Sequence, residues 1–265
     1  MTRRPPRLVL VAGLLLAGAA PATTALRTPA EEDRVVQRLE SEPAKVVSDR
    51  PAGGGVTGAR RLVVRFADGE EMELKWKPVP TGMDGANNSP RKEIAAYQLQ
   101  RLLLDPADHV IPTTILRCMP LEAYDDVGRP SPNPEDAGCV LGEAEIWLDD
   151  VHIPERVYDR EIFRRDPVYA GHVADMNLVT YLIDHRDGRS NNFLMSNDPA
   201  NRRVFSIDNG ISFDPMIFNY FVRNWNEIRV PALRRAAVDR LRHLPPDALE
   251  RLQVVAQMER GEGGV

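Results

Sequence analysis

At positions 185–192 the chain reads His185-Arg186-Asp187-Gly188-Arg189-Ser190-Asn191-Asn192. Asp187 and Asn192 have the spacing of the H-R-D-x-x-x-x-N arrangement, in which the Asp orients or deprotonates an attacking hydroxyl and the Asn holds a metal ion. Polar turns also contain Asp and Asn, because their side chains hydrogen-bond to the local backbone. The spacing alone therefore leaves a catalytic loop and an ordinary turn both open.

Two predicted strands follow this segment, at residues 193–195 and 204–207, and the second runs into Asp208-Asn209-Gly210. A strand–turn–strand hairpin would return Asp208 to the side of Asp187 and Asn192. All three side chains offer oxygen atoms, which a hard cation such as Mg²⁺ prefers. The sequence thus predicts one site for these three residues, suited to a metal ion that bridges nucleotide phosphates.

Upstream, residues 62–77 are predicted to form a hairpin, and alternation places Lys75 and Lys77 on one polar face. A helix predicted to begin at Pro90 carries Glu93 in its first turn. A phosphotransferase needs a fixed cation on the nucleotide phosphates and a carboxylate that holds this cation in place. Lys77 and Glu93 have the right chemistry in the right order. A solvated strand lysine and a helix-dipole acid remain open as the simpler interpretations.

Composition excludes some classes of protein. The 265 residues are 43% hydrophobic and 28% charged, which is enough to bury an ordinary globular core. The formal net charge of -5 argues against binding nucleic acid by neutralising its phosphates. Of the 34 basic residues only four are lysine, so the lysines that remain need an explanation; they are Lys45, Lys75, Lys77 and Lys92.

Residues 1–25 have the order of a secretory signal peptide. A basic start containing Arg3 and Arg4 precedes an apolar run at residues 8–20, and small residues follow at 21–25. The run is short for a bilayer span, so we expect a cleaved leader, no later membrane span and an exported protein, periplasmic, cell-surface or extracellular. Residues 26–43 are polar and charged, and we interpret them as a linker or a loose leading helix.

Cys118 and Cys139 are the only two cysteines. In an exported protein two thiols most simply form one disulfide, which here would close a proline-containing loop. A pair of independent buried thiols stays open as the alternative.

The mature chain changes character along its length. Besides the hairpin, strands are predicted at residues 45–47, 111–116 and 139–148. Helices are predicted at 174–183 and 230–258, and the second of these is interrupted at 244–246. Sheet elements come first and helices dominate later. This order predicts an α+β protein with a smaller sheet-rich lobe and a larger helical lobe.

Several of these segments, in order between about residues 62 and 214, resemble motifs of the secretory-pathway kinases, the Golgi casein kinase and four-jointed group. More distant relatives of that group are the spore-coat and phosphatidylinositol kinases. The matching segments are Trp76-Lys77-Pro78, the run from Glu93 to Leu103, Ile111-Pro112-Thr113-Thr114, Asp175-Met176-Asn177, the segment through Asp187, and Ile207-Asp208-Asn209-Gly210.

The resemblance implies a bilobal protein-kinase-like fold, with an N-lobe at residues 44–140, a C-lobe at 141–265 and ATP in the cleft. Lys77, with Lys75 on the same face, would contact the nucleotide phosphates, and Glu93 would pair with Lys77 or help to hold a metal. Asp187 would be the catalytic carboxylate. Asp208 would bind Mg²⁺ or Mn²⁺, and we assign Asn192 to the metal as well. Asn192 departs from the animal secretory kinases and agrees with kinases in general.

One further motif stays open between two interpretations. Residues 53–58, Gly-Gly-Gly-Val-Thr-Gly, fit the G-x-G-x-x-G pattern of a loop that covers phosphates, but a flexible glycine linker fits equally well.

The sequence therefore predicts an exported, ATP- and metal-dependent kinase, a monomer that phosphorylates a hydroxyl acceptor: a protein Ser or Thr, a sugar or a lipid headgroup. The alternatives are a catalytically inactive kinase-fold module that binds nucleotide or metal, and a secreted interaction domain in which the Asp and Asn residues form a structural cation site.

Overall fold

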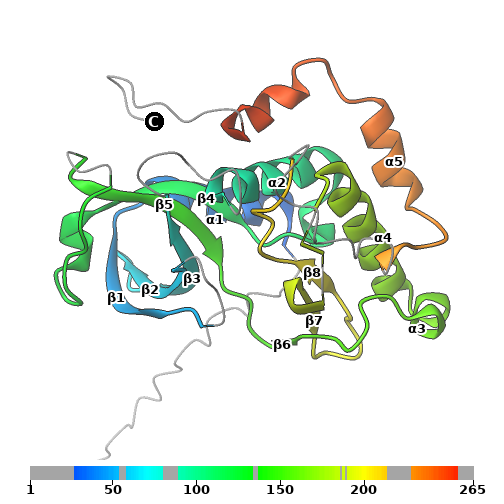
Figure 1. Ribbon diagram of the computed structural model, residues 1–265, viewed down its shortest axis with the longest axis horizontal. Coiled ribbons are helices and arrows are strands. Elements are labelled where there is room, and N and C mark those ends of the chain that lie inside the picture. The colour runs from blue at the N-terminus through cyan, green and yellow to red at the C-terminus, as the bar shows by residue number, and fades with distance from the viewer. Residues whose placement is uncertain are drawn as a thin grey trace, which may run out of the picture.

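The computed structural model of the protein describes residues 27–53, 58–79, 89–133, 137–185, 187–188, 190–213 and 228–255. The predicted signal peptide, residues 54–57 of the glycine motif, and Arg186 and Arg189 of the 185–192 segment lie outside the described residues. Figure 1 shows a sheet at one end of the molecule, α3, α4 and α5 at the other end, and α2 between them.

The N-terminal half is built on one antiparallel five-stranded sheet in the order β1-β2-β3-β5-β4. The sequence predicts four of these strands at or near their observed places, whereas β4 lies later than the predicted 111–116. The strands are β1 (Ala44–Pro51), β2 (Arg60–Phe66), β3 (Glu71–Pro78), β4 (Thr114–Pro120) and β5 (Cys139–Ile146).

Pairing of the strands sorts their side chains onto two faces. Leu62 lies opposite Leu74, and Trp76 lies opposite Ala144, so one face is apolar and buried. Because neighbouring residues in a strand point to opposite faces, Lys75 and Lys77 share the other face with the β5 residues directly across from them. This second face is covered by the helix α2 (Pro90–Leu103), whose Glu93 contacts both lysines.

The chain before the sheet is not a linker. Residues 29–41, predicted as a linker or loose leading helix, form the helix α1 (Pro29–Ser41), which Thr28 and Glu31 begin with a reciprocal capping box. Val36 and Leu39 of α1 are buried in the core, and the Arg117 guanidinium of β4 donates to the Leu39 carbonyl. The packed fold therefore begins near Pro29 rather than at Ala44. A helix with few apolar positions is hard to distinguish from a linker by composition.

The predicted lobe boundary at residue 140 falls inside β5. It would cut through β5, which pairs with β3 on one side and with β4 on the other. The sheet-rich part therefore extends to Ile146, and the chain then continues to β6 (Val151–His152) in a second sheet.

The rest of the chain is mainly helical. Of the helices that the structure describes there, the longest is α4 (Pro167–Leu182), which begins before the predicted 174–183 and is buried along most of its length. A three-stranded sheet in the order β6-β7-β8 lies beside it, and the predicted α+β class with a sheet-rich part before a helical part is confirmed. The remaining elements are η1 (Pro106–Asp108), η2 (Leu121–Tyr124), α3 (Arg160–Arg165), η3 (Ser190–Asn192), β7 (Phe193–Ser196), β8 (Val204–Ser206), α5 (Arg235–Arg242) and η5 (Ala248–Val255).

Cys118 of β4 and Cys139 of β5 form the predicted disulfide, with their Cα atoms 5.5 Å apart. The bond joins two paired strands and closes the loop between them. Disulfides of this kind persist in oxidising compartments, which agrees with a secretory-pathway protein. Within the residues that the structure describes, no helix is both long and apolar enough to cross a membrane.

Candidate active site

Lys77 and Glu93 meet where α2 packs on the sheet. Lys77 is the last residue but one of β3, and Glu93 lies in the first turn of α2, so the hairpin and the helix each fix one partner. The Lys77 ammonium donates to Glu93 Oε1, and the Lys75 ammonium donates to Glu93 Oε2 at 2.8 Å. Both lysines thus bind one carboxylate, as the sequence predicted for Lys77.

The environment of Glu93 keeps this carboxylate charged. Glu93 is 1% exposed and Lys77 is 2% exposed. Burial alone would raise the pKa of the Glu93 carboxyl, but the two ammonium groups outweigh this effect and lower its pKa to about 2. At neutral pH Lys75, Lys77 and Glu93 therefore form an ionised and largely buried cluster, rather than the solvated strand face that the alternation of residues 71–77 allowed.

Asp208 reaches this cluster from the other half of the chain. Its Oδ1 lies 3.3 Å from Lys77 Nζ and 3.9 Å from Lys75 Nζ, although Asp208 is far from both lysines in sequence. Asp208 has a φ of 56°, a left-handed conformation that few residues other than Gly adopt. The backbone N–H of Ser89, at the start of α2, donates to the Gly210 carbonyl at 3.2 Å and ties the two segments together.

The predicted hairpin places Asp187 and Asn192 in the same region. β7 and β8 pair antiparallel, and the backbone N–H of Ile207 donates to the Asn192 carbonyl at 2.9 Å. Asn192 is therefore held against the residue that precedes Asp208. Its side-chain amide donates to the Asp187 carbonyl at 2.7 Å, which fixes the turn between the two residues. Asp187 and Asn192 are both buried.

His185 packs against the residue that follows this turn. Its ring contacts the Phe193 ring edge to face, with the centroids 6.2 Å apart. Burial lowers the pKa of His185, so the ring is held neutral at physiological pH and acts as a packing group beside Asp187.

Sequence reasoning missed two acidic residues of this site. Glu143 and Glu145 of β5 lie directly opposite Lys77 and Lys75 in the strand register, and both are buried. Burial raises the pKa of Glu143 well above its usual value and that of Glu145 to about 7. The available signal was a pair of acids at alternate positions in an otherwise apolar strand.

The glycine motif begins and ends in a hairpin loop. The backbone N–H of Ala52 donates to the Ala59 carbonyl at 2.9 Å, so residues 53–58 connect β1 to β2. Gly53 and Gly58 have φ angles of 83° and 70°, which only Gly adopts freely. Whether this loop covers phosphates stays a prediction.

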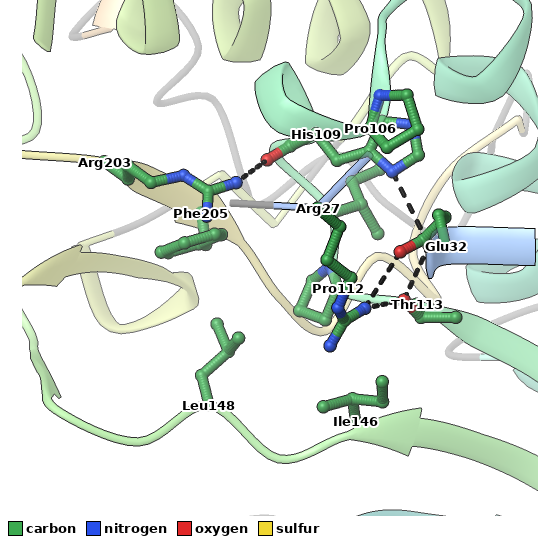
Figure 2. A pocket seen from close by; sticks show the side chains of 11 residues that line it. Arg27, Glu32, Pro106, His109, Pro112, Thr113, Ile146, Leu148, Arg203 and Phe205 are labelled. Atoms are coloured by element: carbon green, nitrogen blue, oxygen red, sulfur yellow. Dashed lines mark hydrogen bonds and ion pairs between the residues drawn. The ribbon is translucent and has the colours of Figure 1, made fainter. Parts of the chain in front are cut away.

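A separate cavity is lined by residues from α1, η1, β8 and the end of β5 and from the segments next to them (Figure 2). One wall carries the buried Glu32 carboxylate, which accepts hydrogen bonds from Tyr97 at 2.5 Å, Thr113 at 2.7 Å and Arg27 at 2.9 Å. The cavity volume of about 30 Å³ holds one or two water molecules and not a nucleotide. This polar network therefore fixes α1 to α2, the helix that carries Glu93.

The assembled parts define a class of fold. A strand lysine paired with a helix glutamate, an Asp that follows the β8 hairpin, and an Asp and Asn on the preceding turn form the arrangement of a bilobal kinase-like fold. The sequence predicted the lysine, the glutamate, both Asp residues and the Asn; their roles stay predictions.

Comparisons with known proteins add little to this geometry. No protein-family model matches the chain, and no curated protein matches it in sequence. Among solved structures it is similar to hydra Fam20 with sugar, with a TM-score of 0.47, 15% identity, and coverage of 91% of this chain and 81% of that one. It is also similar to the Helicobacter pylori proinflammatory kinase CtkA, with a TM-score of 0.34 and 12% identity. This match covers 63% of this chain and 60% of that one.

Proposed function

We propose that the protein is an exported kinase that transfers the γ-phosphate of ATP to a hydroxyl acceptor. The observation that carries this proposal is the contact of Lys77 with both Glu93 and Asp208. It brings a phosphate-binding cation from the sheet-rich half next to a metal-binding carboxylate from the helical half. The predicted signal peptide and the Cys118–Cys139 disulfide support export.

Each residue of the candidate site has a separate role in phosphoryl transfer. Lys77, held by Glu93, binds the phosphates of the nucleotide, and Lys75 adds a second positive charge beside it. Asp187 accepts a hydrogen bond from the acceptor hydroxyl and orients its oxygen toward the γ-phosphate. Asn192 holds the Asp187 turn in place through its amide.

The donor set fits a magnesium or manganese ion. Asp208 offers carboxylate oxygens, and its side chain is 37% exposed, so it remains accessible to an ion. Asn192 uses its amide N–H₂ on the Asp187 carbonyl, which leaves its side-chain oxygen as a ligand. Oxygen-only ligands are those that Mg²⁺ and Mn²⁺ prefer, and the bound ion would neutralise charge on the transferring phosphate.

The test measures turnover and nucleotide binding on the same protein. The purified protein, with Mg²⁺ or Mn²⁺, is expected to release phosphate from ATP and to phosphorylate itself. Asp187→Asn should abolish turnover while leaving ATP-dependent thermal stabilisation intact, and Asp208→Asn should weaken both. Thermal stabilisation by ATP without any phosphate release from the unchanged protein would refute the kinase proposal and identify a nucleotide-binding module. No response to nucleotide or metal would refute both.

A further inference from the structure

A pocket of about 310 Å³ lies beside the turn that carries Asp187. It is lined by residues 155–158, which lie between β6 and α3, and by Gly188, Phe193 and Ile228. Gly188 directly follows Asp187 in the chain. The pocket therefore begins one residue away from the carboxylate that we assign to the acceptor hydroxyl.

Hydrogen bonds from α4 hold two walls of this pocket in place. The Tyr169 hydroxyl donates to the Val157 carbonyl at 2.6 Å and accepts from the Asp159 backbone N–H at 2.7 Å. The Asn177 side-chain amide donates to the Ile228 carbonyl at 2.9 Å. Because one buried helix fixes the backbone of both walls, the pocket is formed before a ligand arrives, which lowers the ordering cost of binding.

The lining has an apolar interior and a charged mouth. Val157, Phe193 and Ile228 are buried, whereas the neighbouring Glu155 and Arg156 are exposed. The three buried side chains offer no hydrogen-bonding atom. A sugar or a lipid headgroup would bring hydroxyl groups into this interior, and a buried hydroxyl without a partner is costly. The interior is instead suited to carbon atoms, and its volume is at the lower end of the range for ligand pockets.

We propose that this pocket binds a bulky apolar side chain of a protein acceptor, such as Leu, Ile, Met or Phe, within three residues of the phosphorylated Ser or Thr. The inference rests on the proposed function, because Asp187 places the acceptor hydroxyl. An extended chain advances about 3.3 Å per residue, and its side chains alternate between two sides. With the hydroxyl at Asp187, a side chain near it in the acceptor sequence reaches the pocket that begins at Gly188.

A peptide array tests the pocket with the full chain. Each peptide carries one central Ser or Thr, and the three positions on either side of it are varied in turn. With ATP and Mg²⁺ or Mn²⁺, we expect one position at which Leu, Ile, Met or Phe raises phosphorylation at least about tenfold over Asp or Gly. The same array is probed for binding of the fluorescently labelled protein without nucleotide, and it should show the same apolar preference.

Two variants change the pocket itself. Val157→Asp places a charge in the apolar interior and should abolish the apolar preference in both assays. Tyr158→Ala enlarges the pocket at a half-buried position and should shift the preference from Leu toward Phe. Circular dichroism establishes that each variant is folded, and Tyr158→Ala serves if Val157→Asp is not. Phosphate release from ATP without peptide should be unchanged in both.

The matched control is Ile153→Asp. Ile153 precedes the pocket residues in the same connection, is 53% exposed and does not line the pocket, so this variant should keep the preference of the unchanged protein. Three results would overturn the proposal: no apolar preference in either assay, an unchanged preference in a folded pocket variant, or phosphorylation of sugars or lipids but of no peptide.

Phosphate release from ATP without peptide reports the kinase function separately. Phosphate release without any apolar preference refutes the pocket proposal and leaves the kinase proposal standing. Apolar-dependent peptide binding that Val157→Asp abolishes, without any phosphate release, refutes the kinase proposal and supports a peptide site in this pocket. Failure of one proposal is therefore distinguishable from failure of the other.

Discussion

Gly142 is the position at which a single methyl group should disturb the sheet that carries the candidate active site. It lies in β5, and a Cβ atom there would stand 2.6 Å from Cζ2 of Trp76 and 2.9 Å from two further atoms of the same ring. Trp76 is 2% exposed, so its ring must move by about 0.8 Å within a packed core before the contact is acceptable. We expect Gly142→Ala to destabilise the protein by about 1–3 kcal/mol, the usual cost of overpacking.

Thermal and urea unfolding measure this effect. For a chain of this size the expected loss corresponds to a melting temperature lower by about 2–12 °C. Gly171→Ala in α4 is the matched control, because its Cβ would meet only Arg234 at 3.6 Å, an ordinary contact. Helix propensity predicts that this control gains about 0.5–1 kcal/mol. If Gly142→Ala is as stable as the unchanged protein or more so, the packing of Trp76 against β5 is not as described.

Three more measurements follow from the structure. Reduction of the Cys118–Cys139 disulfide should lower the free energy of unfolding by about 3 kcal/mol, seen as a lower urea midpoint with reductant, and an unchanged midpoint would contradict a bridge that stabilises the fold. The hydrogen bonds and the ion pair to Glu32 outweigh its burial and lower its pKa, so its contribution to stability is present above about pH 4.5 and is lost on acidification. Glu32→Gln should therefore destabilise at pH 7 and flatten the pH dependence of the melting temperature below pH 4.5; a parallel curve would show that Glu32 is not the group that titrates. Lys77→Arg should abolish phosphate release, because a planar guanidinium does not replace a compact ammonium in a buried site, whereas the exposed Lys45→Arg should be silent in the same assay.

The β7–β8 hairpin of the candidate site was predictable because its signals are local. The strands at 193–195 and 204–207 are short, apolar and separated by turn residues, and their pairing alone brings Asp208 back to Asn192. The lysine strand and the helix start were visible for the same reason. In each case the residues that decide the structure are neighbours in sequence.

Long-range packing decided what the sequence did not show. Alternation of Glu and Lys along residues 71–77 is typical of a solvated strand face, yet the end that carries Lys77 lies buried under α2. The alternation of polar and apolar residues shows that a strand has a polar face. It does not show whether that face contacts solvent or a helix that carries charged residues. For the same reason the sequence did not show that α1 is packed into the fold. Glu32 is a charged residue, and its hydrogen-bond partners Tyr97 and Thr113 are far away in sequence.

The buried charges themselves argue for a function at this place. Replacing a buried ion pair with apolar residues of similar volume is often neutral or stabilising, because desolvation cancels much of the Coulomb attraction. Aliphatic side chains on a sheet face packed under a helix would stabilise the fold at least as well as Lys77, Glu143 and Glu145 do. Strongly shifted pKa values on opposed carboxylates and ammonium groups, here where β3, β5 and α2 meet, are typical of sites that bind charged ligands. The two lysines of β3, in a chain whose 34 basic residues include only four lysines, are best explained by what they bind rather than by what they stabilise.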